Sequence, residues 1–397
     1  MSEGFLFVVD DMQAIQDRQL VRRSRIAVAA IFCVHGSVTG SFATRVPWIQ
    51  EHASVSAGQL GLALAFPAIG ASLSMPLAAR ISHRFGTRAA QRFLIALWTL
   101  ALILPSLATN LLTLCAALFV YGATAGMADV AMNALGVEIE HRLGKSIMSG
   151  LHGMWSVGAL LGSGVGTIAA HLDISAQLHH LVAAGVLTVL GAVASQYVLN
   201  LHPAEDEEAP PRFALPPKSA LLIGAVGFCA VFAEGASLDW SAVYLRDILT
   251  TSAGVAAGAT TGFALTMAIA RIAGDAVVNR WGPVRTVRVS GIIATLGGIL
   301  VVIASNPLVA MVGFGLLGLG IAVVVPLAFA AAGHAGPNKS QAIAGVATVT
   351  YASGLVAPSI IGGIAQASNL TISFIVVTAL TVGLAIFAPV LRPRASL

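Results

Sequence analysis

The sequence predicts an all-α membrane protein with twelve transmembrane helices in two pseudo-symmetric six-helix bundles. Three observations lead to this class: the composition, the number of long apolar segments, and a repeat of half the chain. Hydrophobic residues make up 57% of the 397 residues and charged residues only 10%, whereas a soluble domain carries about 25% charged residues. Such a composition is typical of a membrane protein and argues against a soluble enzyme.

Twelve segments are apolar enough to cross a bilayer, which takes about 20 residues of helix. Glycine and proline inside these segments are compatible with helix, because membrane helices tolerate both. A transmembrane β-barrel would instead show alternating segments of about ten residues. The twelve lie near 26–49, 58–80, 93–109, 111–134, 149–171, 178–200, 219–240, 255–278, 289–305, 307–332, 342–366 and 370–391.

The basic residues predict the orientation. If both termini are cytoplasmic, 18 of the 21 Lys and Arg residues fall on the cytoplasmic side, and only Arg45, Arg246 and Arg271 lie elsewhere. This asymmetry is the positive-inside pattern of the inner (cytoplasmic) membrane. We therefore expect a multi-pass inner-membrane protein, and we attribute the net charge of +4 to topology and not to nucleic-acid binding.

Signals for other functions are missing from the sequence. Residues 1–25 have no apolar core before a small-residue cleavage site, so the first span is expected to direct insertion. The three cysteines lie in apolar segments without a CxxC motif and are expected to be small buried hydrophobes. GxxxxGK[ST] and HExxH are both absent, so we expect no nucleotide cofactor and no metal. An ion gradient, most simply of protons, would supply the energy.

A constant offset of 196 residues relates the two halves of the chain. It pairs Arg84 with Arg280 and Gly86 with Gly282, in the loops HRFGTRAAQR and NRWGPVRTVR. An acidic, proline-rich stretch joins the halves and is expected to be a linker. Parallel repeats imply a cleft between the halves that opens alternately to each side. The expected divisions are 1–25 (cytoplasmic segment), 26–200 (first bundle), 201–218 (cytoplasmic linker), 219–391 (second bundle) and 392–397 (cytoplasmic tail).

The loop ARISHRFGTR (79–88) resembles the signature Gly-x-Leu-Ala-Asp-Arg-x-Gly-Arg-Lys of the major facilitator superfamily. His83 stands at the Asp position of this signature. Arg271 and Asp275 precede the second copy of the loop, and their i,i+4 spacing makes an ion pair expected. The resemblance implies a cytoplasmic gate at His83, Arg84, Gly86, Arg88, Arg271, Asp275, Arg280 and Gly282.

Three further stretches resemble the fucose-permease-like group of this superfamily, especially its YbjJ-like branch. They are ADVAMNA (128–134), SGLHGMWSVG (149–158) and AEGASLDWSAVYL (233–245). Fucose permeases carry an acid and then an asparagine four residues on, where this chain has Asp129 and Asn133. They also carry a second acid on the first helix, where this chain has Ala43 with Arg45 nearby.

Asp129 is the first candidate for proton coupling, because it lies inside an otherwise uncharged span. Intramembrane acids are costly and commonly serve protons or substrates. Burial disfavours the charged carboxylate, which would let Asp129 load and release a proton. Asn133, at i+4, can hydrogen-bond either protonation state. The alternative is a structural Asp that is held by a partner in the bundle.

The seventh span supplies two more acids. Glu234 is expected to face a wet cleft and to take part in proton coupling. Asp239, five residues on and about 140° around the helix, is expected near the outer mouth, beside Trp240. Trp240 and Tyr244 are expected either in an aromatic belt at the membrane surface or stacked on substrate.

The remaining candidates come from three other helices. His35 lies near the midplane of the first span, as a proton relay or as a packing residue. Arg45, in the outer turns of that span, is expected to snorkel, to pair with Glu234 or Asp239, or to bind an anionic substrate. His152, Trp155 and Tyr351 are expected to bind substrate or to pack within the bundle.

These observations, with the resemblance, predict a secondary transporter and not an enzyme. We expect proton symport of a small polar or amphipathic solute, sugar-like in particular, by alternating access. The expected partners are the solute, protons and the lipid bilayer, with no nucleic acid, and one chain suffices as a monomer. The alternatives are a proton-antiport exporter of drugs or metabolites, and a membrane sensor that does not transport. Fold alone does not decide between them.

Overall fold

The computed structural model describes residues 2–144, 147–200, 218–332 and 339–392. Within these ranges the chain is helical and contains no strand. Twelve helices in the described part are long and apolar enough to cross a membrane. The predicted class and the predicted number of spans are therefore confirmed.

The first half packs six spans from nine helical pieces. Prolines account for several of the breaks between pieces, because a proline has no N–H to continue a preceding helix but fits the first turn of a new one: Pro47 lies in the first turn of α2 and Pro67 in the first turn of α4. The helices of this half are α1 (Ser2–Ala43), α2 (Val46–His52), α3 (Ala57–Ala63), α4 (Phe66–Phe85), α5 (Thr87–Ala101), α6 (Leu104–Leu107), α7 (Leu111–Leu143), α8 (Met148–His171) and α9 (Ala176–Ser195).

The second half follows the same plan, with a break between α13 and α14 close to Pro326. Its helices are α10 (Lys218–Asp247), α11 (Ala253–Trp281), α12 (Pro283–Ile303), α13 (Pro307–Ile321), α14 (Val324–Ala332), α15 (Lys339–Ala367), α16 (Leu370–Phe387) and the 3-10 turn η1 (Ala388–Leu391).

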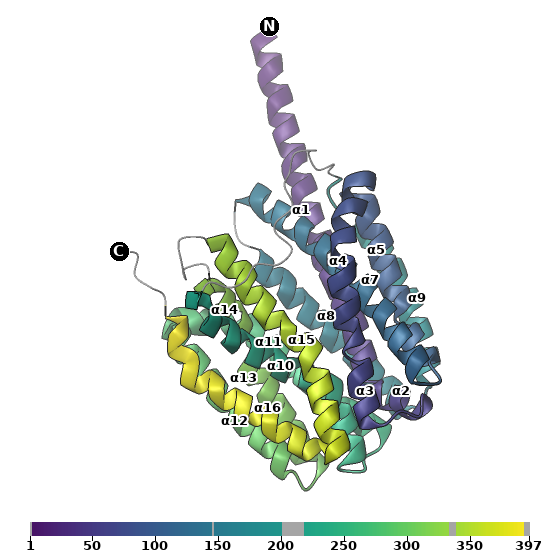
Figure 1. Ribbon diagram of the computed structural model, residues 1–397. Coiled ribbons are helices and arrows are strands. Elements are labelled where there is room, and N and C mark those ends of the chain that lie inside the picture. Colours follow the sequence, from purple (N-terminus) through teal and green to yellow (C-terminus); the bar gives the residue numbers. More distant parts are fainter. Residues whose placement is uncertain (1, 145–146, 201–217, 333–338, 393–397) are drawn as a thin grey trace.

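The first predicted span, 26–49, is wrong at both ends. Helix α1 begins at Ser2 and ends at Ala43, and the chain turns at Thr44–Arg45 before α2. The N-terminal part of α1 extends well beyond the rest of the bundle (Figure 1). The seventh span also runs further than predicted, since α10 continues to Asp247.

Two glycines give the sequence repeat its structural counterpart. Gly86 ends α4 with φ 78° and ψ 156°, and Gly282 ends α11 with φ 77° and ψ 162°. Each donates its N–H to a carbonyl four residues earlier, on Ser82 and Val278 respectively. This backbone conformation is essentially restricted to glycine. The offset of 196 residues therefore connects positions with the same backbone geometry.

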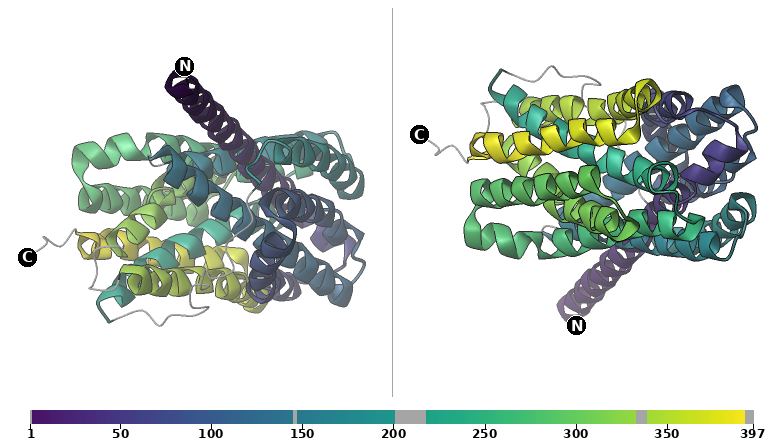
Figure 2. Two further views of the ribbon diagram at one scale, coloured as in Figure 1. Left: turned by 90° about the horizontal axis from the view of Figure 1, so that it is seen from above. Right: turned by 90° about the horizontal axis from the view of Figure 1, so that it is seen from below.

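The two halves lie side by side, the first in purple to blue and the second in green to yellow (Figures 1 and 2). The start of α1 and the end of α16 lie on one side of the bundle, which we call the termini side. The opposite side, with α2, the α8–α9 turn and the α10–α11 turn, is the far side.

The halves meet from the middle of the bundle to the far side. At the far side, α3 crosses α15 where Gly61 faces Gly362, and a side chain on either glycine would overlap the other helix. Among the described residues, the hydrogen bonds between the halves also lie in this region. They join Gly58 to Gln366 (3.3 Å), Arg246 to Glu51 (2.6 Å), Thr167 to Thr261 (2.8 Å) and Arg271 to Ser156 (3.0 Å).

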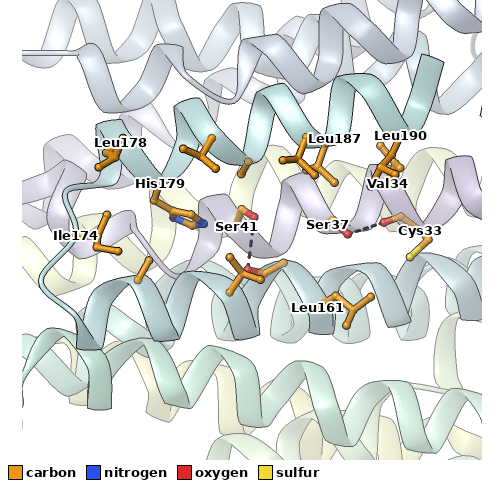
Figure 3. Close-up of a pocket in the computed structure, with 16 residues that line it drawn as sticks. Cys33, Val34, Ser37, Ser41, Leu161, Ile174, Leu178, His179, Leu187 and Leu190 are labelled. Atoms are coloured by element: carbon orange, nitrogen blue, oxygen red, sulfur yellow. Dashed lines mark hydrogen bonds between the residues drawn. The ribbon is translucent and has the colours of Figure 1, made fainter. Parts of the chain in front are cut away.

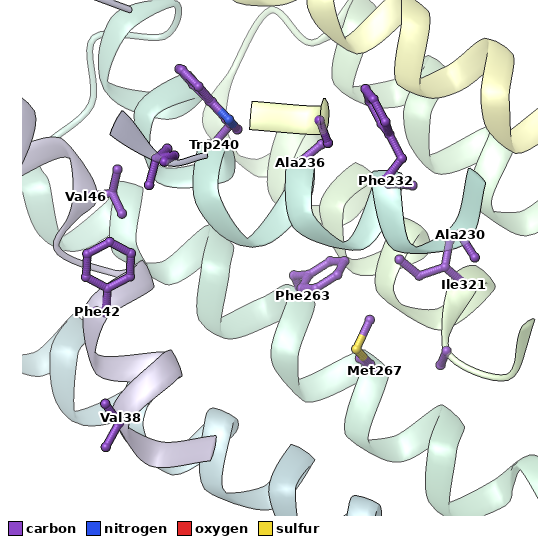
Figure 4. Packing of buried hydrophobic residues seen from close by; sticks show 14 of the residues in the cluster. Val38, Phe42, Val46, Ala230, Phe232, Ala236, Trp240, Phe263, Met267 and Ile321 are labelled. Carbon is purple, nitrogen blue, oxygen red and sulfur yellow. The ribbon is translucent and has the colours of Figure 1, made fainter. Parts of the chain in front are cut away.

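Buried side chains of α10 and α11 form the core of the second half and reach the first half at α2 (Figure 4). Trp240 is fully buried, and so is Tyr244, whose hydroxyl donates to the carbonyl of Val301 at 2.7 Å. The predicted aromatic belt is therefore wrong for both residues. Burial of Trp240 also keeps it from stacking on a solute in this conformation.

Candidate functional site

Helix α7 places Asp129 in the middle of the first half. The helix has 33 residues and is capped by Asn110, whose side chain accepts the N–H of Thr113. Asn133 donates from Nδ2 to Oδ1 of Asp129 at 3.1 Å and to its carbonyl at 2.9 Å. Both side chains are half-buried. Oδ2 of Asp129 makes no hydrogen bond to a described residue, so it can still accept a proton or a solute hydroxyl.

Tyr121 of α7 lies near an acid of the second half. Tyr121 and Asp129 lie eight residues apart, so they share one face of the helix. The carboxylate of Asp239 on α10 is close enough to the Tyr121 hydroxyl to act on it electrostatically. Asp239 is half-buried. Asp239 therefore lies where the second half approaches α7 of the first half.

His35 connects three helices of the first half. Its Nδ1 accepts a hydrogen bond from Nε1 of Trp155 at 3.1 Å, and its Nε2 lies 3.4 Å from the carbonyl of Ala125. The imidazole also stacks on Trp98, with ring centroids 5.0 Å apart. Both ring nitrogens are thus engaged by fixed partners. This geometry favours the packing role, with the proton on Nε2, over the relay role.

His152 and Trp155 lie one turn apart on α8, as their spacing predicts. Trp155 is half-buried, and the guanidinium carbon of Arg271 lies 6.0 Å from its ring centroid. His152 is exposed and meets Phe32 edge-on, at 5.3 Å between ring centroids. The indole of Trp155 therefore lies at the boundary between the halves. His152 lies on the termini side of Trp155.

Arg271 of α11 is the cation of this site. Its Nη2 lies 3.1 and 3.2 Å from the two carboxylate oxygens of Glu234, and its Nη1 donates to Oγ of Ser156 at 3.0 Å. The side chains of Arg271 and Glu234 are 18% and 16% exposed. Arg271 thus binds an acid of its own half and a hydroxyl of the other half.

The predicted ion pair between Arg271 and Asp275 is wrong. Asp275 is exposed and forms no ion pair with a described residue. The i,i+4 spacing allowed the local pair, but Glu234 lies opposite Arg271 in a less hydrated region, where an ion pair is stronger. The expectation of a wet cleft around Glu234 needs the same correction, because its carboxylate is largely covered and bound to Arg271.

Arg45 does not reach the central site. It lies at the turn between α1 and α2, is 3% exposed, and donates to the carbonyl of Ile174. Snorkelling and pairing with Glu234 or Asp239 are therefore both wrong. Its positive charge instead acts on two neighbouring imidazoles, those of His179 and His180 on α9.

The signature loops lie on the termini side. Arg88 donates from Nε to the carbonyl of Val198 at 3.0 Å, which ties the loop to the end of α9 within its own half. His83, Arg84 and Arg280 are exposed. Among the described residues, no hydrogen bond joins these loops across the halves.

Some residues of the site were not predicted from the sequence. Ser156 carries no distinguishing signal beyond its place next to Trp155, and Trp98 and Tyr121 read as ordinary core aromatics. Glu140 accepts the N–H groups of Ile147 and Met148 at 2.6 and 3.0 Å, so it supports the start of α8. The side chain of Tyr351 lies outside the described residues.

A small cavity of about 10 Å³ lies between Trp155 and Ser156 on one side and Phe263 and Met267 on the other. Its volume is close to that of one water. The described residues form no cluster of His, Cys, Asp and Glu that could hold a metal ion. The site instead combines carboxylates, one guanidinium, hydroxyls and an indole, which suit hydrogen bonding to a polar solute and transfer of a proton.

Comparison with known families gives a match over nearly the whole chain. The model of the Major Facilitator Superfamily matches residues 27–243 and 223–396. The uncharacterized transporter y4wD of Sinorhizobium fredii is 34% identical over 370 residues, covering 92% of this chain and 97% of the relative. Membrane protein MosC of Rhizobium meliloti is 31% identical over 349 residues, covering 87% and 84%.

Solved structures share the fold at low sequence identity. A variant of the nucleoside transporter NupG aligns with a TM-score of 0.74 at 10% identity, covering 94% of this chain and 99% of the other. A D-xylose–proton symporter aligns with a TM-score of 0.71 at 13% identity, covering 93% and 97%. FucP in the outward conformation aligns with a TM-score of 0.61 at 16% identity, covering 93% and 99%.

Proposed function

Because the chain belongs to the Major Facilitator Superfamily of transporters, we propose that it moves a small polar solute by proton-coupled symport. Alternating access of a central site between the two halves is the proposed mechanism. A sugar-like solute is favoured by the fucose-permease-like stretches around Asp129 and Trp155. A D-xylose–proton symporter and FucP among the structural neighbours are consistent with this choice.

The observation that carries the proposal is the environment of Asp129. Its carboxylate lies half-buried within a span, with Oδ2 unbound by described residues. A carboxylate in that position costs free energy when ionised, and it becomes neutral when it takes up a proton. Asn133 can bond to it in both states. Asp129 would therefore bind a proton in one conformation and release it in the other.

Arg271 would connect the second half to this cycle. In the present conformation it joins Glu234 to Ser156 across the halves. A solute hydroxyl that replaced Ser156, or a proton that neutralised Glu234, would weaken one of the two contacts. Loss of the Ser156 contact would free the halves to separate at this level, and a neutral Glu234 would release Arg271 from its own half. Glu234 is thus a second proton-coupling candidate, acting through Arg271.

The conformation would be the one that opens to the cytoplasm. The contacts between halves described above lie between the middle and the far side. If the basic loops are cytoplasmic, as the positive-inside pattern predicts, the termini side faces the cytoplasm and the far side is closed. Both chain ends would then be cytoplasmic in the inner membrane.

The test is solute-induced charge movement in proteoliposomes, with panels of sugars, polyols and cationic drugs. Wild type should give an inward current with its solute, because protons enter with it. Asp129→Asn should abolish the current and retain solute exchange. The matched control is Glu138→Gln on the same helix, which removes an exposed carboxylate paired with Arg142 and should keep the wild-type current.

Three results would contradict the proposal. A current that survives in Asp129→Asn would remove the proton role of this residue. Proton movement opposite to the solute would indicate an antiport exporter. Tight solute binding without flux in sealed vesicles would indicate a sensor.

A further inference from the structure

A second cavity lies away from the central site, at the outer surface of the first half. It is a groove of about 530 Å³ between α1, α8 and α9. In Figure 3, α9 runs along the top with Leu178, Leu187 and Leu190, α8 runs below with Leu161, and α1 lies between them. We call it the α1–α8–α9 groove. Its volume is within the range of known ligand sites.

The walls of the groove are part of the surface that would face lipid. Leu161, Leu178, Val182, Val186 and Leu190 line it, and each is more than half exposed. These residues belong to helices that span the membrane. An occupant would therefore enter sideways from the bilayer and not through the central site.

The lining has few free hydrogen-bonding groups for a polar ligand. Ser37 donates to the carbonyl of Cys33 at 2.9 Å, and Ser41 donates to the carbonyl of Gly162 at 3.5 Å (Figure 3). Their hydroxyl hydrogens are therefore used within the protein. The other lining residues are apolar, apart from Cys33 and His179. A hydrocarbon chain suits such a lining better than a sugar or a nucleoside does.

The groove has the length of one leaflet. On α9 it extends from Leu178 to Leu190, which is about 18 Å at 1.5 Å per residue. Half of a hydrocarbon core of about 30 Å is about 15 Å. One end lies at the α8–α9 turn on the far side, at Ile174, and the other lies near mid-membrane beside Cys33. A single acyl chain of the far-side leaflet fits this span.

The far-side end carries polar groups without partners. His179 lines the groove and is 5% exposed, and neither of its ring nitrogens has a hydrogen-bond partner among the described residues. Arg45 donates from Nη2 to the carbonyl of Ile174 at this end, while among the described residues its Nε and Nη1 have no partner and it forms no ion pair. A buried charge without a counterion is costly. Asp173 of the α8–α9 turn is exposed and does not pair with Arg45.

We propose that the α1–α8–α9 groove binds one acyl chain of an anionic phospholipid from the far-side leaflet, with its phosphate at the Arg45–His179 end. The chain fills the apolar groove. The headgroup supplies the negative charge that Arg45 lacks within the protein. This proposal does not depend on the transported solute or on proton coupling.

Native mass spectrometry of the purified full-length protein tests this proposal, with dioleoyl phosphatidylglycerol and dioleoyl phosphatidylcholine as the probes. Wild type should retain phosphatidylglycerol about fivefold better, which corresponds to one basic residue near a lipid headgroup. Val186→Trp places an indole in the groove and should lower retention of both lipids. The matched control is Val189→Trp, on the same helix and 61% exposed but outside the groove, and it should retain both lipids as wild type does.

Variants of Arg45 test the headgroup end separately. Arg45→Gln should reduce retention of phosphatidylglycerol to that of phosphatidylcholine, and Arg45→Lys should restore part of the preference. Equal retention of both lipids by wild type would overturn the headgroup assignment. Equal lipid retention by Val186→Trp and Val189→Trp would overturn the assignment of the groove as the lipid site. If Arg45→Gln does not fold, the two valine variants and Arg45→Lys still decide between these outcomes.

Discussion

Arg271 donates to Glu234 in its own half and to Ser156 in the other half, through different nitrogens of one planar group. A lysine has a single ammonium nitrogen, so it could not keep both contacts in the same geometry. Removing the cation would leave Glu234 as a largely covered acid without a partner. Removing both charges would leave a neutral pair. The role of each residue can therefore be separated by single and double substitutions.

The first prediction concerns this pair. Arg271→Gln should lower the free energy of unfolding by about 3 kcal/mol, the lower end of the range for a broken buried pair. The double variant Glu234→Gln/Arg271→Gln should recover most of that loss. Thermal unfolding in detergent measures both. Arg271→Lys should keep the stability but reduce solute uptake in proteoliposomes at least about tenfold. Equal stability of the single and the double variant would contradict the assigned pair.

At the scale of elements, the contact of α1 with α8 depends on glycines in both helices. Gly36 and Gly40 of α1 lie against the backbone of α8, and Gly158 and Gly162 of α8 lie against the backbone of α1. A side chain at any of these positions would overlap a backbone atom. Small residues spaced four apart allow membrane helices to pack this closely. The contact holds Trp155 near His35.

Gly158→Ala should therefore force α1 and α8 apart. We expect a loss of roughly 1–3 kcal/mol in stability, as for overpacking in a dense core. Gly164→Ala on the same helix meets no atom within 4 Å and should be neutral or stabilising by up to about 1 kcal/mol, because alanine favours helix. Thermal unfolding of the two variants compares them directly. Equal unfolding temperatures would contradict the close contact.

Sequence reasoning predicted the elements better than their contacts. The twelve spans, the repeat and the Asp129–Asn133 pair depend on local pattern, and the structure contains them. The breaks at Thr44–Arg45 and before Pro67 were not predicted, because proline is also tolerated within membrane helices. Arg271 was assigned to Asp275 because only neighbours along one helix can be judged from spacing. Its actual partner, Glu234, is on another helix.

At the scale of the whole molecule, the far side is where the halves touch most closely. Gly61 and Gly362 cross there, and Arg246 reaches Glu51 nearby. The ion pair is largely solvent-exposed, so it contributes at most about 1 kcal/mol. The helix crossing is therefore the stronger constraint. Helices α3 and α15 can cross this closely only because each has a glycine, without a side chain, at the crossing point.

Gly362→Trp should prevent this closure and stop transport while the protein still folds, since each half keeps its own core. The matched control is Gly363→Trp, because the neighbouring glycine is exposed and meets no atom within 4 Å. Uptake into proteoliposomes should fall to background for Gly362→Trp and stay near wild type for Gly363→Trp. Equal uptake by the two variants would mean that the crossing does not open and close during transport.

The central claim is that the two halves rock about the site between Asp129 and Arg271. The most direct test is electron–electron distance measurement with spin labels on the two sides of the bundle, after replacement of the three native cysteines. One pair, at Leu172 and Leu308, reports on the far side, and another, at Ala89 and Arg285, reports on the termini side. All four positions are exposed. Relative to Gly363→Trp, the variant Gly362→Trp should lengthen the far-side distance and shorten the termini-side distance. Unchanged distances, or changes of the same sign on both sides, would contradict the account.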